Sequence, residues 1–312
     1  MRQARLRLPY PVELGRIAAG ICGATRFERS AATLWWATVT PDGVGTLRLA
    51  PSFEGLAADA WGPGADWLVA QAPALVGAED LGADRFAPDA PLLAAQLRRV
   101  GPVRLGRTDR VADALLVGIL GQKVQGAAVK RSLARLQRRH GEPAPGPAPA
   151  GLRTFPSAAT LASVPSWEYH RCGVERSRAD TIVRAAKVAH RLEEAAGMGA
   201  DVLDRRLRAV RGIGLWTSAI VRAGACGDAD AVPVGDFHIA HHVCHALTGT
   251  PRGSDERMLE LLEPYRGDRL RAVNLILASG RGAPRRGQKL DFVPVDELDR
   301  PGSWHQKRSA GG

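Results

Sequence analysis

The first part of the chain alternates apolar and polar positions in the way that β-strands do. Residues 33–40 (TLWWATVT) and 45–50 (GTLRLA) are two such runs, separated by the turn sequence PDG. Trp35 and Trp36 are adjacent, so on a strand they point to opposite faces, and packing in the sheet is the expected role of both. Residues 1–95 are therefore expected to form a small β-rich domain.

From about residue 108 the apolar positions follow a helical spacing instead. The pattern predicts helix through 109–140, which ends in a basic run. The stretch 141–151 (GEPAPGPAPAG) cannot be helical, because proline and glycine interrupt it throughout. Ser157 is placed to cap a short helix, and 177–194 predicts a long basic amphipathic helix.

Two of the predicted helices meet in residues 207–223 (LRAVRGIGLWTSAIVRA). Gly212 and Gly214 would allow a tight turn with φ values that other residues disfavour. The start of the second helix would present unpaired backbone N–H groups and the positive end of the helix dipole, a combination that binds anions. A GxG before a helix is weak by itself, because ordinary packed helix pairs also contain it.

The net charge of +11 makes a phosphate the natural anion for this site, since a basic excess of this size favours polyanionic partners. A genome that prefers arginine to lysine would explain part of the excess. The four cysteines show no CxxC spacing, which argues against a disulfide framework or a cysteine zinc site and fits a reducing cytoplasm. No apolar run approaches the roughly 20 residues of a membrane span, so no membrane association is expected.

The sequence VRGIGLWTSAIV (210–221), followed by VPVGD (232–236), resembles the hairpin, Gly/Pro-rich loop and aspartate signature of the HhH-GPD DNA glycosylases. Residues 119–141 resemble the helix of the AlkA branch that approaches the DNA minor groove. Residues 155–189 are similar to the two helices that follow it there, and the whole resemblance covers about 100–285.

The resemblance implies an α+β protein in which a small N-terminal β-rich domain precedes a two-lobed, mostly α-helical glycosylase core. The implied parts are the β-rich domain (1–95), a helical domain with the hairpin (111–228), a helical domain that carries the catalytic aspartate (96–110 and 229–300), and a disordered tail (301–312).

Asp236 stands alone in the segment AVPVGDFHIAHHV, where it could cap a helix, end a metal site or serve as a catalytic carboxylate. In the HhH-GPD enzymes the aspartate at this position stabilises positive charge on the sugar while the N-glycosidic bond of a flipped base breaks. The resemblance implies this role for Asp236, and a capping role is compatible with it. The spacing of the histidines that follow would permit zinc on one helix face, with packing or a DNA-facing surface as the alternative; they are His238, His241, His242 and His245.

The resemblance also assigns the DNA-binding residues. Gly212, Gly214 and Thr217 match the positions that hold a phosphate, and Gln122 lies on the helix that approaches the minor groove. The backbone carbonyls of a monovalent cation site, for Na⁺ or K⁺, would come from Arg208, Val210 and Ile213.

Trp216 determines the predicted subclass. In bifunctional relatives a lysine stands here and attacks the sugar. Tryptophan cannot do so, but it can form a wall against an electron-poor alkylated base. The pocket would be completed by Ile220, Leu277 and Ala278, where the AlkA branch has aromatic residues, so the usual alkylpurine preference is in doubt.

Lys123 departs from the family pattern. AlkA-like enzymes have an apolar residue just after the glutamine that corresponds to Gln122, and it fills the gap left by the flipped base. Lysine could insert its methylene stem and send its ammonium to a phosphate or a base edge. It could also attack the sugar as a weak nucleophile, or simply be solvated on a basic helix.

The sequence thus predicts a monofunctional DNA glycosylase that releases alkylated or otherwise modified bases from double-stranded DNA and initiates base excision repair. The alternatives are a glycosylase for bulky or enzymatically modified bases and a non-catalytic DNA-binding protein. We expect a cytoplasmic, nucleoid-associated monomer with no organic cofactor. No iron–sulfur cluster is expected either, because no cysteine follows Cys244.

Overall fold

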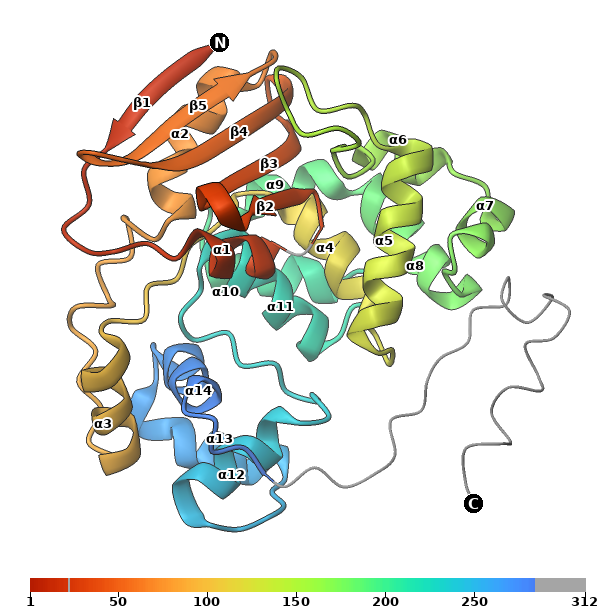
Figure 1. Ribbon diagram of the computed structural model, residues 1–312. Helices are drawn as coiled ribbons and strands as arrows, with labels where there is room; N and C mark the ends of the chain where they lie inside the picture. Colours follow the sequence, from red (N-terminus) through yellow and green to blue (C-terminus); the bar gives the residue numbers. More distant parts are fainter. Residues whose placement is uncertain (22, 284–312) are drawn as a thin grey trace, which may run out of the picture.

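The N-terminal part of the chain forms a five-stranded antiparallel sheet with the strand order β1-β5-β4-β3-β2 (Figure 1). The computed structural model describes residues 1–21 and 23–283, so the expected tail 301–312 lies outside the described residues. The strands are β1 (Arg2–Leu6), β2 (Thr25–Glu28), β3 (Thr33–Thr40), β4 (Gly43–Ser52) and β5 (Gly55–Trp61). Strands β3 and β4 are the two runs predicted from the alternation, which is thereby confirmed.

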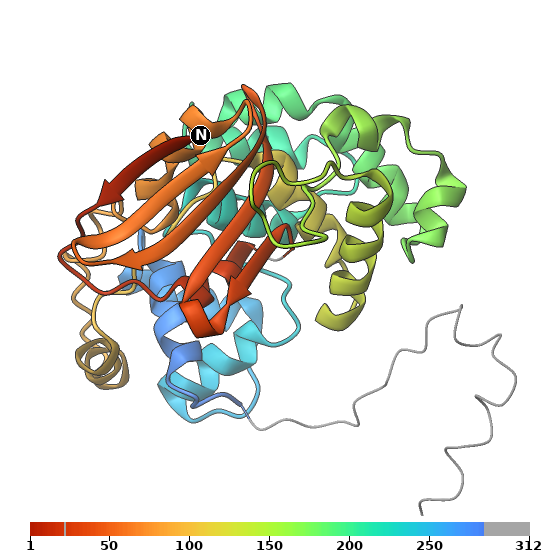
Figure 2. The same cartoon turned by 45° about the horizontal axis from the view of Figure 1, so that its top comes forward.

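The two faces of the sheet are covered differently. Helices α1 (Leu14–Ile21) and α2 (Ala65–Leu75) pack on one face, where Trp36 is buried in an apolar cluster with both helices. On the other face Trp35 stacks on Trp61 with 5.6 Å between ring centroids, beneath the proline-rich stretch 141–151. Figure 2, turned toward this side, shows that stretch running along the sheet. Both tryptophans therefore pack in the sheet, as expected.

The remainder of the described chain is helical, apart from its loops. The helices are α3 (Pro91–Val100), α4 (Val111–Leu120), α5 (Gly126–His140), α6 (Ala158–Ser163), α7 (Ser166–Arg171), α8 (Arg176–Lys187), α9 (Ala189–Ala196), α10 (Ala200–Arg208), α11 (Leu215–Cys226), α12 (Ile239–Thr248), α13 (Asp255–Leu262) and α14 (Arg269–Ala278), with short 3₁₀ turns η1 (Arg29–Ala31) and η2 (Glu263–Tyr265). Ser157 caps α6 as predicted, because its Oγ accepts a hydrogen bond from the backbone N–H of Thr160 at 3.1 Å. Within the described residues, none of these helices combines the length and apolar character needed to cross a membrane.

Two of the predicted helices are each broken into a pair. The helix expected through 109–140 is interrupted between α4 and α5, where Lys123 takes a left-handed φ of +56°. The helix expected over 177–194 breaks at Val188, which separates α8 from α9. Both predictions of continuous helices were wrong for one reason: apolar residues keep helical spacing on either side of each break, so the periodicity does not register it.

Apolar side chains gather in three large clusters. The first lies between the sheet and the two helices that cover it. The second contains residues from every helix between α4 and α11, both included. The third joins the C-terminal helices to Phe86 and Leu93. Phe86 and Leu93 thus pack with the C-terminal helices and not against the sheet, and the boundary expected at residue 95 stays a prediction.

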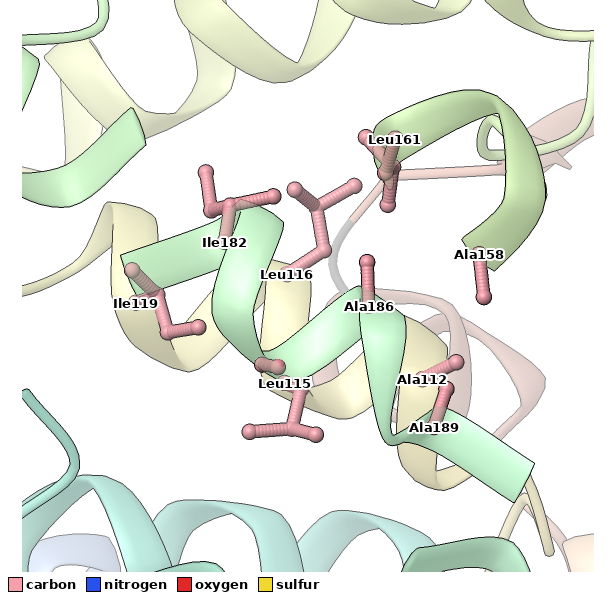
Figure 3. A pocket seen from close by; sticks show the side chains of 10 residues that line it. Ala112, Leu115, Leu116, Ile119, Ala158, Leu161, Ile182, Ala186 and Ala189 are labelled. Carbon is pink, nitrogen blue, oxygen red and sulfur yellow. The ribbon is translucent and has the colours of Figure 1, made fainter. Parts of the chain in front are cut away.

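Helices α4, α6, α8 and α9 enclose a small apolar cavity of about 10 Å³ (Figure 3). Leu116, Leu161 and Ile182 point into it together with several alanines. The space is about that of one water molecule, so this cavity cannot hold a nucleobase. The residues expected to form the site lie elsewhere, where α11 and α12 begin.

Candidate active site

Helices α10 and α11 form the predicted hairpin, and its turn depends on one glycine. Gly212 has φ +100°, and a Cβ added there would lie 2.3 Å from Oγ1 of Thr181, so no larger residue fits. Gly214 differs: its φ is −103° and an added Cβ would meet open space. The prediction of an unusual φ at Gly214 was wrong, because the extended backbone there is open to any residue.

The hairpin is held from α4 and α8. Nε2 of Gln122, just beyond α4, donates to the carbonyl of Gly212 and to Oγ1 of Thr217, both at 2.9 Å. Nε of Arg184, on α8, donates to the carbonyl of Arg211 at 3.0 Å. Thr217 is only 2% exposed, so its hydroxyl faces Gln122 and not the surface. Gln122 is thus a brace for the turn in this structure.

The start of α11 has no side-chain cap, because its N-cap residue is Gly214. The backbone N–H groups of the first turn therefore point outward without an internal acceptor side chain. Leu215, the first residue of the helix, is 50% exposed, which places this helix start at the surface.

The three carbonyls expected to bind a monovalent cation lie in or next to the same turn. The carbonyl of Val210 accepts the N–H of Ile213 at 3.0 Å, which leaves it one lone pair. Backbone carbonyl oxygens are hard ligands suited to Na⁺ or K⁺. Arg208, Val210 and Ile213 therefore fit such an ion in donor chemistry, and the cation site stays a prediction.

Asp236 stands at the start of α12 and uses both carboxylate oxygens. Oδ1 accepts the backbone N–H groups of His238 at 2.8 Å and Ile239 at 3.0 Å, so the carboxylate caps the helix as expected. Oδ2 accepts Nε1 of Trp216 at 3.1 Å. The carboxylate is half-buried and oriented by three N–H donors from two helices.

The indole of Trp216 is fixed at both ends. Its nitrogen donates to Asp236, and its far carbon Cη2 would lie 3.0 Å from a Cβ added at Gly121, the residue after α4. The ring therefore spans from the end of α4 to the catalytic candidate. A flat aromatic surface beside a carboxylate is an arrangement that can hold a planar base next to a negative charge.

Several solved structures that superpose on this chain are of DNA glycosylases. A 3-methyladenine DNA glycosylase from Archaeoglobus fulgidus superposes with a TM-score of 0.72 over 90% of this chain and 99% of its own, at 19% sequence identity. An 8-oxoguanine glycosylase/lyase from Clostridium acetobutylicum, solved with double-stranded DNA, gives 0.62 over 84% and 89%, at 13% identity. A 3-methyladenine DNA glycosylase from Schizosaccharomyces pombe, in complex with abasic DNA, gives 0.50 over 62% and 93%, at 18% identity.

The chain has the fold of the helix-hairpin-helix DNA glycosylases. No protein-family model matches the sequence, and no curated protein does either. The sequence identities to these structures are below 20%, so the similarity shows the fold alone and assigns no role to individual residues.

The other pocket candidates of the glycosylase fold lie on α11 and α14. Ile220 is one turn beyond Trp216, and its Cγ2 would lie 3.7 Å from a Cβ added at Gly118 of α4. Leu277 is 46% exposed at the end of α14, which packs against α12. The carbonyl of Ala278 accepts Nη2 of Arg99 at 3.1 Å, so α3 holds this end of the helix.

Phe237 was missed by the sequence analysis. It follows Asp236 directly and is 80% exposed, with its ring edge-on to His238 at 4.8 Å. A large aromatic residue directly after the predicted catalytic residue was the signal that could have identified it.

Lys123 is exposed at the tip of the turn between α4 and α5, next to Gln122. Its left-handed φ of +56° is uncommon for a residue other than glycine and tends to occur at functional sites. The structure thus places the lysine on an exposed turn. The alternative of a solvated lysine on a basic helix had placed it on a helix surface.

Among the described residues, the histidines at the start of and along α12 belong to no group of three candidate metal ligands. Nδ1 of His242 accepts the backbone N–H of Ala283 at 2.9 Å, and Nδ1 of His241 contacts the backbone of Gly253. Among the described residues, the one group of three candidate ligands comprises His140, Glu168 and Cys172 and lies elsewhere. There Glu168 is held by Arg139 through two hydrogen bonds of 2.6 and 2.7 Å, and the guanidinium already supplies the positive charge that a metal would.

Proposed function

We propose that the protein is a monofunctional DNA glycosylase that hydrolyses the N-glycosidic bond of alkylated bases flipped out of double-stranded DNA, and so initiates base excision repair. The observation that carries the proposal is the contact between Asp236 and Trp216, which puts a carboxylate of fixed orientation beside an aromatic surface. The glycosylase fold supports it, because it brings these two residues and the hairpin together.

In the proposed reaction the base sits against Trp216, and the C1′–N bond breaks with both electrons leaving on the base. The sugar becomes an oxocarbenium ion, whose positive charge the carboxylate of Asp236 stabilises. A water molecule then attacks C1′ to form the new C–O bond, and its surplus proton passes to the solvent. The N–H groups of His238, Ile239 and Trp216 hold the carboxylate in one position throughout, so little reorganisation accompanies the charge.

The start of α11 supplies the proposed DNA contact. Its uncapped N–H groups can donate to a phosphate, and the net charge of +11 favours the approach of a polyanion. Na⁺ or K⁺ on the carbonyls of the hairpin would add positive charge there when bound. Because Thr217 is buried against Gln122, the proposed phosphate contact is assigned to backbone groups of the turn and not to the threonine hydroxyl.

A second candidate is a glycosylase for bulky or enzymatically modified bases. Ile220, Leu277 and Ala278 are aliphatic, and Leu277 is 46% exposed, so this side of the pocket is less closed than a complete aromatic wall would be. An open aliphatic wall accepts adducts that a narrow aromatic slot would exclude.

Base release from a panel of duplexes tests the proposal. Each duplex carries one alkylated, deaminated or bulky base, and released base is separated by liquid chromatography under single-turnover conditions. We expect release of a methylpurine by the wild-type protein and by Asp201→Asn, which changes an exposed carboxylate in the first turn of α10. Release of bulky bases alone would favour the second candidate. Salt-sensitive binding without release of any base would identify a non-catalytic DNA-binding protein.

A further inference from the structure

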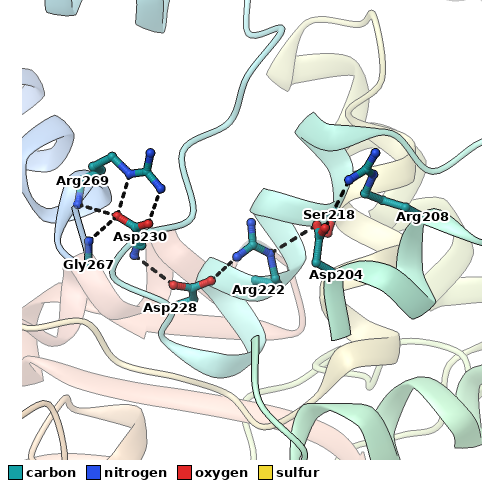
Figure 4. Close-up of polar contacts among 8 residues, drawn as sticks. All are labelled: Asp204, Arg208, Ser218, Arg222, Asp228, Asp230, Gly267 and Arg269. Atoms are coloured by element: carbon teal, nitrogen blue, oxygen red, sulfur yellow. Dashed lines mark hydrogen bonds and ion pairs between the residues drawn. The ribbon is translucent and has the colours of Figure 1, made fainter. Parts of the chain in front are cut away.

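A chain of charged side chains links the hairpin to α14 (Figure 4). Starting in α10, it passes through α11 and the loop before Asp236 and ends at the start of α14. Its members are Asp204, Arg208, Ser218, Arg222, Asp228, Asp230, Gly267 and Arg269. None of these side chains takes part in the proposed chemistry, and of these residues only Arg208 has another proposed role, through its backbone carbonyl.

Asp230 is the most heavily bonded residue of this chain. Its Oδ1 accepts the backbone N–H of Gly267 at 2.8 Å, the backbone N–H of Arg269 at 3.2 Å and Nε of Arg269 at 2.7 Å. Its Oδ2 accepts the other guanidinium nitrogen, Nη2. Burial alone would raise the pKa of Asp230, but the hydrogen bonds from Arg269 and Gly267 hold that pKa below its usual value. The carboxylate therefore stays ionised and bidentate against Arg269.

Asp228 attaches the same loop to α11. One of its oxygens accepts the backbone N–H of Asp230 at 2.9 Å, and the other accepts Nη1 of Arg222. Beneath these contacts Ala219 of α11, Ala231 of the loop and Leu270 of α14 form a small apolar cluster. The loop is thus fixed to α11 and α14 by the ion pairs of Asp228 and Asp230 and by this apolar cluster.

The fixed part of the loop is joined to Asp236 by a short run of backbone hydrogen bonds. The N–H of Val232 donates to the carbonyl of Asp230 at 2.9 Å, and the N–H of Asp236 donates to the carbonyl of Pro233 at 3.2 Å. With the N–H of Val234 donating to the carbonyl of Val232 at 2.9 Å, these short-range hydrogen bonds restrict the loop between Asp230 and Asp236. The other end of α14 carries Leu277, about 12 Å along the helix from Arg269.

From this arrangement we infer that Asp230, together with Arg269, is a positioning residue: the pair fixes the loop to α14 so that Asp236, Trp216 and the end of α14 keep one mutual geometry during base release. The inference rests on the proposed function. Misplacing a catalytic group by about 1 Å lowers rates by roughly 100-fold, so a contact of this kind acts on the rate although it touches no substrate.

A double-mutant cycle tests the inference. Asp230→Asn, Arg269→Gln and the double variant are compared with the wild type for the single-turnover rate of methylpurine release and for Kd on a duplex with a tetrahydrofuran abasic-site analogue. We expect each single variant to lose at least about tenfold in rate, with less than about threefold change in Kd. The double variant should be no slower than the slower single variant, since both changes remove one contact.

Asp59→Asn is the matched control. Like Asp230, which is partly buried, the buried Asp59 accepts from an arginine, Arg48 at 2.9 Å, and it also accepts from Gln3 at 2.8 Å, but it lies in the N-terminal sheet. It should lower Tm as much as Asp230→Asn does and leave the rate unchanged. The inference is overturned if the variants at Asp230 and Arg269 release base at the wild-type rate. It is also overturned if their loss of rate is no larger than the fraction of unfolded protein in the thermal unfolding curves explains.

Amide hydrogen exchange separates this inference from the proposed function. Peptides that cover 229–239 should exchange at least about tenfold faster in Asp230→Asn than in the wild type or Asp59→Asn. If exchange is faster in Asp230→Asn but the wild-type protein releases no base, Asp230 fixes the loop and the proposed function is rejected. If the wild type releases base but exchange is unchanged in Asp230→Asn, the positioning role of Asp230 is rejected and the proposed function stands.

Discussion

Helices α11 and α12 begin next to each other, joined by the hydrogen bond between Trp216 and Asp236, yet their first turns are completed in opposite ways. The start of α12 is closed from inside by the carboxylate of Asp236. The start of α11 follows Gly214, which has no side chain to offer, and stays open. In the proposed function the closed start positions a negative charge for the sugar, and the open start receives the negative charge of a phosphate.

Helix starts of both kinds occur elsewhere in the described chain: those of α3, α5 and α8 have no side-chain cap, whereas α4, α6 and α13 are capped. The first N–H groups of α4 donate to Glu193 of α9, from Val111 at 2.9 Å and from Ala112 at 3.0 Å. Helices α6 and α13 are closed by serines. A cap is worth about 1 kcal/mol, so leaving α11 without one forgoes stability at the place where the ligand is proposed to bind.

The largest effect that separates the open start from an ordinary turn is expected at its two glycines. Gly212→Ala should lower Tm and should also weaken affinity for duplex DNA by at least about tenfold, because its Cβ would collide with Thr181 at a left-handed φ. Gly214→Ala should keep the wild-type Tm, since its Cβ meets open space, and still weaken binding, because the methyl group would stand where the phosphate approaches. Fluorescence anisotropy with a labelled duplex and thermal unfolding measure the two quantities.

Equal behaviour of the two variants would remove the distinction. If Gly214→Ala binds duplex DNA as the wild type does, the phosphate does not approach the start of α11.

A smaller effect is expected at the brace. Gln122→Ala removes two hydrogen bonds of 2.9 Å to Gly212 and Thr217 and should lower the free energy of unfolding by about 1–2 kcal/mol. Binding of duplex DNA should weaken severalfold, because the turn that presents α11 loses its support. Urea unfolding and the same anisotropy titration test both statements. Lys123→Ala is the control for stability alone, since the neighbouring side chain is exposed and its removal should not change the free energy of unfolding.

The smallest effect concerns the closed start of α4, where Asp113 lies in the first turn. Burial raises its pKa to about 6, although attraction to Arg110 and a hydrogen bond of 2.7 Å from Thr38 oppose the rise. A carboxyl whose pKa is higher in the folded state stabilises the fold at low pH, and that stability is lost as the pH rises through 6. Between pH 5 and pH 8 the wild type should therefore lose about 1 kcal/mol more than Asp113→Asn, measured by urea unfolding. Parallel pH profiles would show that Asp113 does not titrate in this range.

The parts of the site that lie close together in the sequence were predictable. The hairpin and the loop to Asp236 form nearly continuous motifs, and the roles of Gly212 and Asp236 in turn and cap follow from local backbone requirements. The strands β3 and β4 were predictable for the same reason, since alternation and turn residues are local signals.

The parts that depend on distant partners were not predictable. Asp230 and Arg269 are 39 positions apart, and neither stands out by spacing or composition. Glu193 closes α4 from 82 positions away. The breaks at Lys123 and Val188 leave the apolar spacing intact, so only the packing of α5 and α9 shows them. Contacts between residues so far apart in the chain leave no local pattern in a single sequence.

The most direct test of the account measures rate and binding on one duplex with Asp236→Asn. Asparagine can still cap α12 with its carbonyl oxygen, but it carries no charge and turns an N–H₂ toward Nε1 of Trp216. We expect the single-turnover release of methylpurine to fall by at least about 100-fold, while Kd for the same duplex changes less than about threefold. A variant that releases the base at the wild-type rate would contradict the assignment of Asp236 as the catalytic carboxylate.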